Sequence, residues 1–270
     1  MSRGTISFVE SFLGIIVSTI VPVYVGLFAT SLFRKAAASY LAAFSFGVFF
    51  WYLSDTISDS AYLDVNAGFS GGLIHASLFS LAVLGFLAFA FVDRNSLVGA
   101  TSEGGSRRLF TVPILVGIGL SFHAFGEGAG FGVLAASTSS TSLVDAVGGY
   151  GPGASYVLHK VLEGSVIGTS YWIYMRDAGL RESFRRMVML GLIFGIPTFM
   201  GEAVAYFYQF DATYFFAIAT GSSIYVALRL AKPLFGPGTL TSLEAIRVVV
   251  LITAGFTSIY LAALLHSTSL

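Results

Sequence analysis

The chain has 270 residues, of which 56% are hydrophobic and only 10% carry a charge. Such a composition lies outside the range of soluble globular domains and is typical of an integral membrane protein. The formal net charge of zero says little about partners, among which we expect no nucleic acid. The absence of cysteine excludes disulfides, thiolate ligands and iron–sulfur chemistry.

The chain contains eight apolar segments in succession. We interpret each of them as long enough to cross about 30 Å of hydrocarbon as a helix. We therefore predict an all-α integral membrane protein, an eight-transmembrane-helix bundle that forms a single domain over residues 1–270. The second segment is short in its apolar part and takes Asp55 into its last turn. The predicted spans are residues 8–33, 40–58, 72–92, 111–136, 154–174, 188–208, 214–230 and 245–265.

Lysine and arginine gather in every second connection between the predicted spans. Twelve of the 14 cationic residues fall in the connections after spans 1, 3, 5 and 7 or in the span ends that border them, whereas the opposite connections carry aspartates and no Lys or Arg. The positive-inside rule places the basic connections in the cytoplasm and both termini on the extracellular side. The twelve are Arg34, Lys35, Arg94, Arg107, Arg108, Arg176, Arg181, Arg185, Arg186, Arg229, Lys232 and Arg247.

Two pairs of ionisable residues with the same spacing lie inside the predicted fourth and fifth spans. His123 precedes Glu127 by four residues, and His159 precedes Glu163 in the same way, so each pair shares one helix face. Carboxylates inside hydrocarbon are costly and mark functional sites by default. Imidazole and carboxylate groups from two facing helices make a site for a divalent transition metal, and we predict that these four residues bind it. The structural alternative is hydrogen bonding between helices, which Asn, Ser or Thr would provide at lower cost.

Other ionisable residues extend this predicted site. Lys160 follows His159 and is turned by about 100° around the helix, where its ammonium group can partly neutralise the two glutamates; alternatively it extends to the membrane interface. Asp55 and Asp59 are one turn apart and form either an entrance for cations or ordinary solvated charges at a helix end. Glu202 in the sixth span is a further candidate for an accessory ligand.

A glycine follows each motif glutamate, at Gly128 and Gly164. Small residues at such positions allow close approach between membrane helices. They also weaken a helix locally, and a bend exposes backbone carbonyls that line a metal path. Both interpretations remain open from the sequence.

The two motifs resemble those of the ZIP (Zrt/Irt-like) family of divalent metal transporters. His-Ala-Phe-Gly-Glu-Gly at 123–128 is similar to the fourth-helix His-Asn/Ser-x-x-Glu/Asp-Gly motif, and His-Lys-Val-Leu-Glu-Gly at 159–164 to the fifth-helix His-x-x-x-Glu motif. The resemblance implies a multi-pass protein of the plasma membrane, and a homodimer. It also implies that the protein imports zinc, or else iron, manganese or cadmium, into the cytoplasm. The metal would be its substrate, and the protein would have neither a cofactor nor an enzymatic activity.

The chain also departs from the family pattern. Many bacterial members hold a second metal partly through the residue after each motif histidine, and these positions are Ala124 and Lys160 here. Neither side chain is an ordinary metal ligand. Taken together with this departure, the resemblance therefore predicts a single transported metal ion. The usual proline before each motif glutamate is replaced by Gly126 and Leu162.

Two other classes of protein compete with the transporter interpretation. An intramembrane zinc-dependent hydrolase would use three ligands, an open position for water and a spare glutamate as base, but the chain has no His-Glu-x-x-His pair. A retinal protein would need a Schiff-base lysine in its last span, and residues 245–265 contain none.

Overall fold

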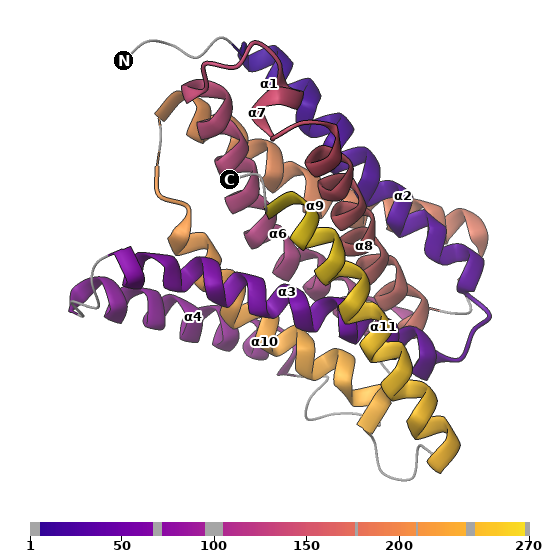
Figure 1. The fold of residues 1–270 in the computed structure, drawn as a ribbon. Helices are drawn as coiled ribbons and strands as arrows, with labels where there is room; N and C mark the ends of the chain where they lie inside the picture. The colour runs from indigo at the N-terminus through magenta and orange to yellow at the C-terminus, as the bar shows by residue number, and fades with distance from the viewer. Residues whose placement is uncertain are drawn as a thin grey trace.

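The computed structural model describes residues 6–66, 72–94, 105–175, 178–208, 210–235 and 241–267, and every regular element within these ranges is helical (Figure 1). The elements before the centre of the chain are α1 (Phe8–Ile15), a π-helix (Ile16–Ile20), α2 (Val21–Ala29), a 3-10 turn (Thr30–Phe33), α3 (Ala38–Asn66), α4 (Leu73–Val92) and α6 (Gly105–Ser137). After it come α7 (Leu143–Ala146), α8 (Tyr150–Tyr174), α9 (Leu180–Tyr208), α10 (Thr213–Phe235) and α11 (Ser242–Ser267).

Within the described residues, 7 helical segments are long and apolar enough to cross a membrane, as expected of a multi-pass membrane protein. The segment from Phe8 to Phe33 is one of them and joins α1, the π-helix and α2. Helix α8 is not among the 7, because serine, histidine, lysine and glutamate interrupt its apolar sequence. The predicted count of eight spans therefore depends on α8, whose 25 residues extend over about 37 Å.

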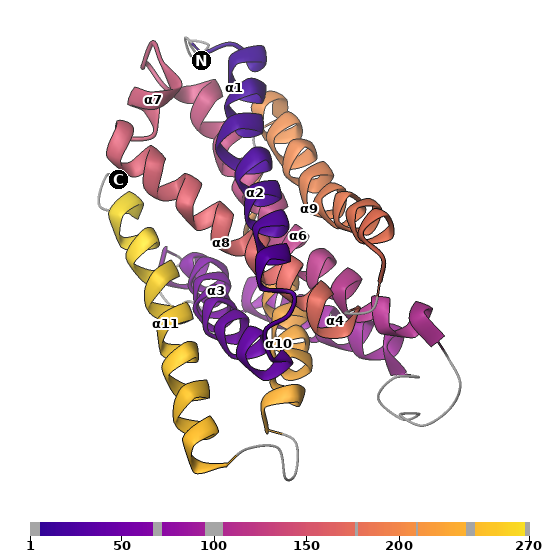
Figure 2. The same cartoon turned by 90° about the vertical axis from the view of Figure 1, so that its right-hand side faces the viewer.

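The helices form two groups that pack against each other (Figures 1 and 2). In the first group α2 packs along α8, and α6 packs most extensively along α9. In the second group α10 packs against both α3 and α4, and α11 packs along α3. Contacts of α8 with α3 and α11, and of α6 with α10, join the two groups.

The motif glycines lie at close contacts within the first group. A Cβ atom on Gly128 would overlap the carbonyl oxygen of Thr198 on α9, and one on Gly164 would overlap that of Val23 on α2. Both glycines are inside continuous helices. The structure therefore supports close helix packing, and not a local bend, as the role of these two residues.

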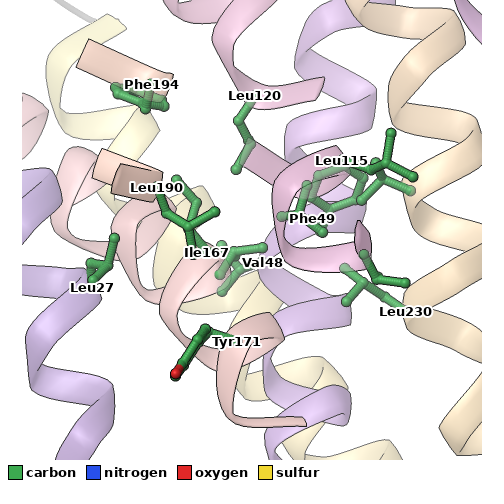
Figure 3. Packing of buried hydrophobic residues seen from close by; sticks show 14 of the residues in the cluster. Leu27, Val48, Phe49, Leu115, Leu120, Ile167, Tyr171, Leu190, Phe194 and Leu230 are labelled. Atoms are coloured by element: carbon green, nitrogen blue, oxygen red, sulfur yellow. The ribbon is translucent and has the colours of Figure 1, made fainter. Parts of the chain in front are cut away.

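The apolar core lies between the two groups, where side chains from both meet (Figure 3). Its members are all buried, with at most 6% of their surface exposed. Labelled examples are Leu27 on α2, Phe49 on α3, Leu120 on α6, Ile167 on α8, Phe194 on α9 and Leu230 on α10.

Several helices continue beyond the apolar segments predicted from the sequence. Helix α3 runs to Asn66, so Asp59 lies inside the helix, as predicted for Asp55, and not in a connection. Helix α10 continues past Arg229, which the sequence assigns to a basic connection. Arg229 is instead buried: its Nε atom lies 2.9 Å from the Oδ2 atom of Asp93 at the end of α4. Because the hydroxyl group of Tyr225 also donates to that carboxylate, at 2.7 Å, this cluster joins α4 to α10.

Candidate metal centre

The first motif lies in the middle of α6, where His123 is almost fully buried. Its Nε2 atom lies 3.4 Å from Oε1 of Glu127, one helical turn further on. The same nitrogen lies 3.7 Å from Oδ2 of Asp55 on α3. The imidazole therefore faces two carboxylates, one from each group of helices.

The second motif lies in the middle of α8, where His159 and Glu163 are both buried. The Nε2 atom of His159 lies 3.1 Å from Oε1 of Glu163. This is the contact expected for residues four apart on one helix face. The second carboxylate oxygen of Glu163 is left for another partner.

That partner is Lys160, whose side chain is completely buried. Its Nζ atom donates to Oε2 of Glu163 at 2.7 Å and also to Oε2 of Glu127 on α6. The lysine thus joins the two motif glutamates across the α6–α8 contact. Two carboxylates and one ammonium group leave one uncompensated negative charge when the imidazoles are neutral.

Three of the four predicted ligands converge most closely. The ligand atoms of His123, Glu127 and Glu163 all lie within 4.8 Å of one another. His159 is attached to this group through its contact with Glu163. Imidazole nitrogen and carboxylate oxygen are ligands that suit zinc, iron(II) and manganese, so the arrangement is able to hold a divalent ion.

A second group of candidate ligands adjoins the first. Asp55, Asp59 and His123 also bring their ligand atoms within 4.8 Å of one another. Because His123 belongs to both groups, the two aspartates of α3 are continuous with the motif residues. Asp55 and Asp59 are only partly buried, whereas His123 is not exposed.

Aromatic side chains surround the centre. The ring of Tyr52 meets that of His123 edge to face at a centroid distance of 4.8 Å, and Trp51 meets the ring of His159 in the same way at 5.3 Å. The Nζ atom of Lys160 lies 5.3 Å from the centre of the Tyr156 ring. These rings lower the local dielectric constant around the ionised groups and thereby strengthen the electrostatic interactions between them.

Glu202 is the predicted accessory residue that the structure does not bring into either group of candidate ligands among the described residues. It lies on α9 and is completely buried. The polar side chain that faces it is Ser11 of α1. Its assignment as an accessory metal ligand stays a prediction without support from these contacts.

The sequence did not indicate that Asp55 would touch His123, or that Tyr52, Trp51 and Tyr156 would enclose the site. The contacts of Asp55, Tyr52 and Trp51 join residues far apart in the chain, and no local spacing encodes them. Tyr156, by contrast, lies four residues before Lys160 on α8, so helix geometry alone places its ring near the ammonium group. Tyr52 and Asp55 do lie on the same face of one helix, three residues apart, which is a weak signal that both face one neighbour.

Comparison with known proteins gave no match, either to a protein-family model or to a curated protein.

Proposed function

We propose that this chain is a transporter of divalent transition-metal ions, with zinc as the first candidate and iron(II), manganese or cadmium as alternatives. The observation that carries the proposal is the convergence of His123, Glu127 and Glu163 within 4.8 Å in the interior of an apolar helical bundle. The resemblance of the two motifs to the ZIP family supports the same function. The ion is the substrate, and no enzymatic step is needed.

In this proposal the four ligands are His123, Glu127, His159 and Glu163, with α8 counted as the eighth span. The alternation of basic connections favours a cytoplasmic side next to the start of α9 and the end of α10, and places both termini outside. We propose the plasma membrane as its location and import as its direction.

The entry path in this proposal starts at Asp55 and Asp59. Their carboxylates attract cations, and the position of both within 4.8 Å of His123 leads from this acidic pair to the motif residues. Release into the cytoplasm requires the site to open on the other side. Movement of the group that carries α6 and α8 against the group that carries α3 and α10 would achieve this.

Lys160 has a defined part in this cycle. While no metal is bound, its ammonium group compensates one of the two negative charges of Glu127 and Glu163. A divalent ion that binds the same carboxylates must displace the ammonium group from at least one of them. Because a second metal would meet this positive charge, the lysine favours one metal ion for each chain.

The proposal is tested by zinc uptake into liposomes that contain the purified protein. We expect uptake in the unaltered protein and its loss in His123→Ala, because the imidazole is a ligand and is not replaced by any neighbour. Unaltered zinc flux in His123→Ala would remove the proposed site.

The matched control is Glu182→Gln, which alters a carboxylate at the start of α9 that pairs with Arg185 and Arg186 at the surface. Uptake by this variant is expected to equal that of the unaltered protein. Thermal unfolding of all three proteins separates loss of the site from loss of the fold.

A hydrolase remains the second candidate, because the closest group contains three ligands and so fits catalytic zinc with a fourth position for water. Cleavage of a lipid or peptide that requires zinc, without zinc flux in the same preparation, would favour it.

A further inference from the structure

Glu202 is a membrane-embedded acidic residue that the proposed transport cycle does not use. It lies two turns before the end of α9, and its exposed fraction is 0%. Among the described residues, neither of its carboxylate oxygens has a hydrogen-bond partner. An intramembrane ionisable residue without a counter-charge indicates a functional site, since an unpaired carboxylate ion in such a place is very costly.

The surroundings of Glu202 hold one polar group that also lacks a partner. Ser11 of α1 faces the carboxyl group, is itself 0% exposed, and its Oγ atom forms no hydrogen bond within the described part of the chain. A serine hydroxyl group is able to accept a hydrogen bond from a neutral carboxylic acid and also to donate one to a carboxylate. The complete burial of Glu202 without a counter-charge, and not the hydroxyl group by itself, therefore favours a protonated carboxyl group.

Aromatic contacts close this pair off. The ring of Phe12 on α1 stacks on that of Phe199 on α9 with centroids 4.8 Å apart, and Phe8 packs against Tyr206 at 5.3 Å. Phe199 and Tyr206 lie one turn before and one turn after Glu202 on the same face of α9. The polar pair is thus enclosed between two aromatic contacts of the α1–α9 interface.

No charged group faces Glu202 from the described residues of the helices packed around it. On α1, Glu10 is exposed and accepts a hydrogen bond from the backbone of Ser7 at 2.8 Å. On α6, the residues packed against the Glu202 turn are Gly128 and Gly132. On α9 itself, the hydroxyl group of Tyr206 donates to the backbone of Ile6 at 3.0 Å.

We propose that Glu202 and Ser11 form a proton-binding site within the membrane, and that this site is occupied in the conformation of the structure. The turn that carries Glu202 packs on Gly128, next to the proposed ligand Glu127. Loss of the proton requires the carboxyl group to reach water, and therefore a separation of α1 from α9. If the proposed transport function holds, the proton is the ion whose movement is coupled to that of the metal.

The first test is infrared spectroscopy of the purified protein at neutral pH. We expect a carbonyl stretching band of a protonated carboxyl group that is lost in Glu202→Gln and retained in the control Glu182→Gln. Ser11→Ala keeps the acid and removes its acceptor, so the band is expected to remain and shift to higher frequency. Identical spectra for the unaltered protein and Glu202→Gln, or an unshifted band in Ser11→Ala, would overturn the proposal.

The second test measures zinc uptake into proteoliposomes at several external pH values, together with the internal pH. We expect uptake to be accompanied by a change of internal pH, and this change to be lost in Glu202→Gln. Zinc uptake with the same proton movement in Glu202→Gln would overturn the coupling. Absence of zinc uptake by the unaltered protein would instead overturn the transport function. The proton site would then still be decided by the infrared test, which does not depend on transport.

Discussion

The two His-x-x-x-Glu motifs have the same spacing but different surroundings. On α6, His123 also faces Asp55 at 3.7 Å, and the side chain of Glu127 keeps 17% of its surface exposed. On α8, the side chain of Glu163 is only 1% exposed, and its two oxygens hold His159 and Lys160. One local pattern thus produces a half that adjoins the acidic residues of α3 and a half that is enclosed.

This difference in surroundings gives the two histidine–glutamate pairs different expected roles. Asp55 lies 3.7 Å from His123, which lies 3.4 Å from Glu127, so we expect a cation that arrives at Asp55 to meet these two residues first. Glu163 is more deeply buried than Glu127 and is bound by Lys160. We therefore expect the α6 half to govern capture of the ion and the α8 half to govern the stability of the empty site.

The largest effect is expected from Glu163→Ala, which removes a ligand and leaves Lys160 with one fewer partner. Breaking a buried ion pair lowers the free energy of unfolding by about 3–5 kcal/mol. We expect a loss near the lower end of this range, because Glu127 still holds the ammonium group, together with loss of zinc uptake. Thermal unfolding in detergent without metal measures the first effect, and liposome uptake the second.

Glu127→Ala is the comparison variant for this prediction. It also removes one partner of Lys160, but from the more exposed half of the site, so its effect on stability is expected to be smaller. Equal losses of stability in the two variants would contradict the distinction between the halves.

Lys160→Asp is expected to change the number of metal ions that bind. The substitution replaces the ammonium group with a carboxylate, so the bound metal should rise from about one to about two ions per chain. Metal analysis of the dialysed protein measures this, with Lys160→Met as the variant that removes the charge without adding a ligand. A stoichiometry that stays the same in Lys160→Asp would show that the lysine does not limit the site to one ion.

Asp55→Asn is expected to weaken capture more than it slows release. Loss of one charge from the entrance should raise the KM for zinc by about tenfold at low ionic strength and by less at high salt, with the maximal rate kept. Uptake measured over a range of zinc and salt concentrations tests this. A fall in the maximal rate at constant KM would place Asp55 in a later step.

Asp59→Asn should have the smallest effect of the series. Asp59 contacts the site through the same His123 but is one turn further from Glu127, so we expect a rise in KM of about twofold, again screened by salt. An effect larger than that of Asp55→Asn would reverse the proposed order of the two entrance residues.

Much of the helical framework can be predicted from the apolar segments of the sequence. Residues 72–92 and 188–208, for example, coincide closely with α4 and with the later part of α9. Helix ends were predicted less well, since polar residues in the first turns of α9 and the last turns of α10 were assigned to connections. Arg229 shows why: its charge suggests exposure, but a distant aspartate, Asp93, makes burial favourable.

The site was predictable to the extent that it depends on local spacing. His123 with Glu127 and His159 with Glu163 each share a helix face, and the helix geometry alone requires it. The contact between His123 and Asp55 depends instead on how α3 is placed against α6. That placement is set by the packing of many apolar side chains, which no short motif records.

The π-helix of the first span changes the rotation of α1 about the helix axis relative to α2. The ring of Pro22 would clash with the carbonyl group of Ser18 in a regular α-helix, and the wide turn from Ile16 to Ile20 relieves this clash. One additional residue in a turn rotates α1 by about 100° relative to α2. The bulge therefore points Ser11 toward α9 while Gly26 meets α8, so that a single span serves two neighbours on different sides.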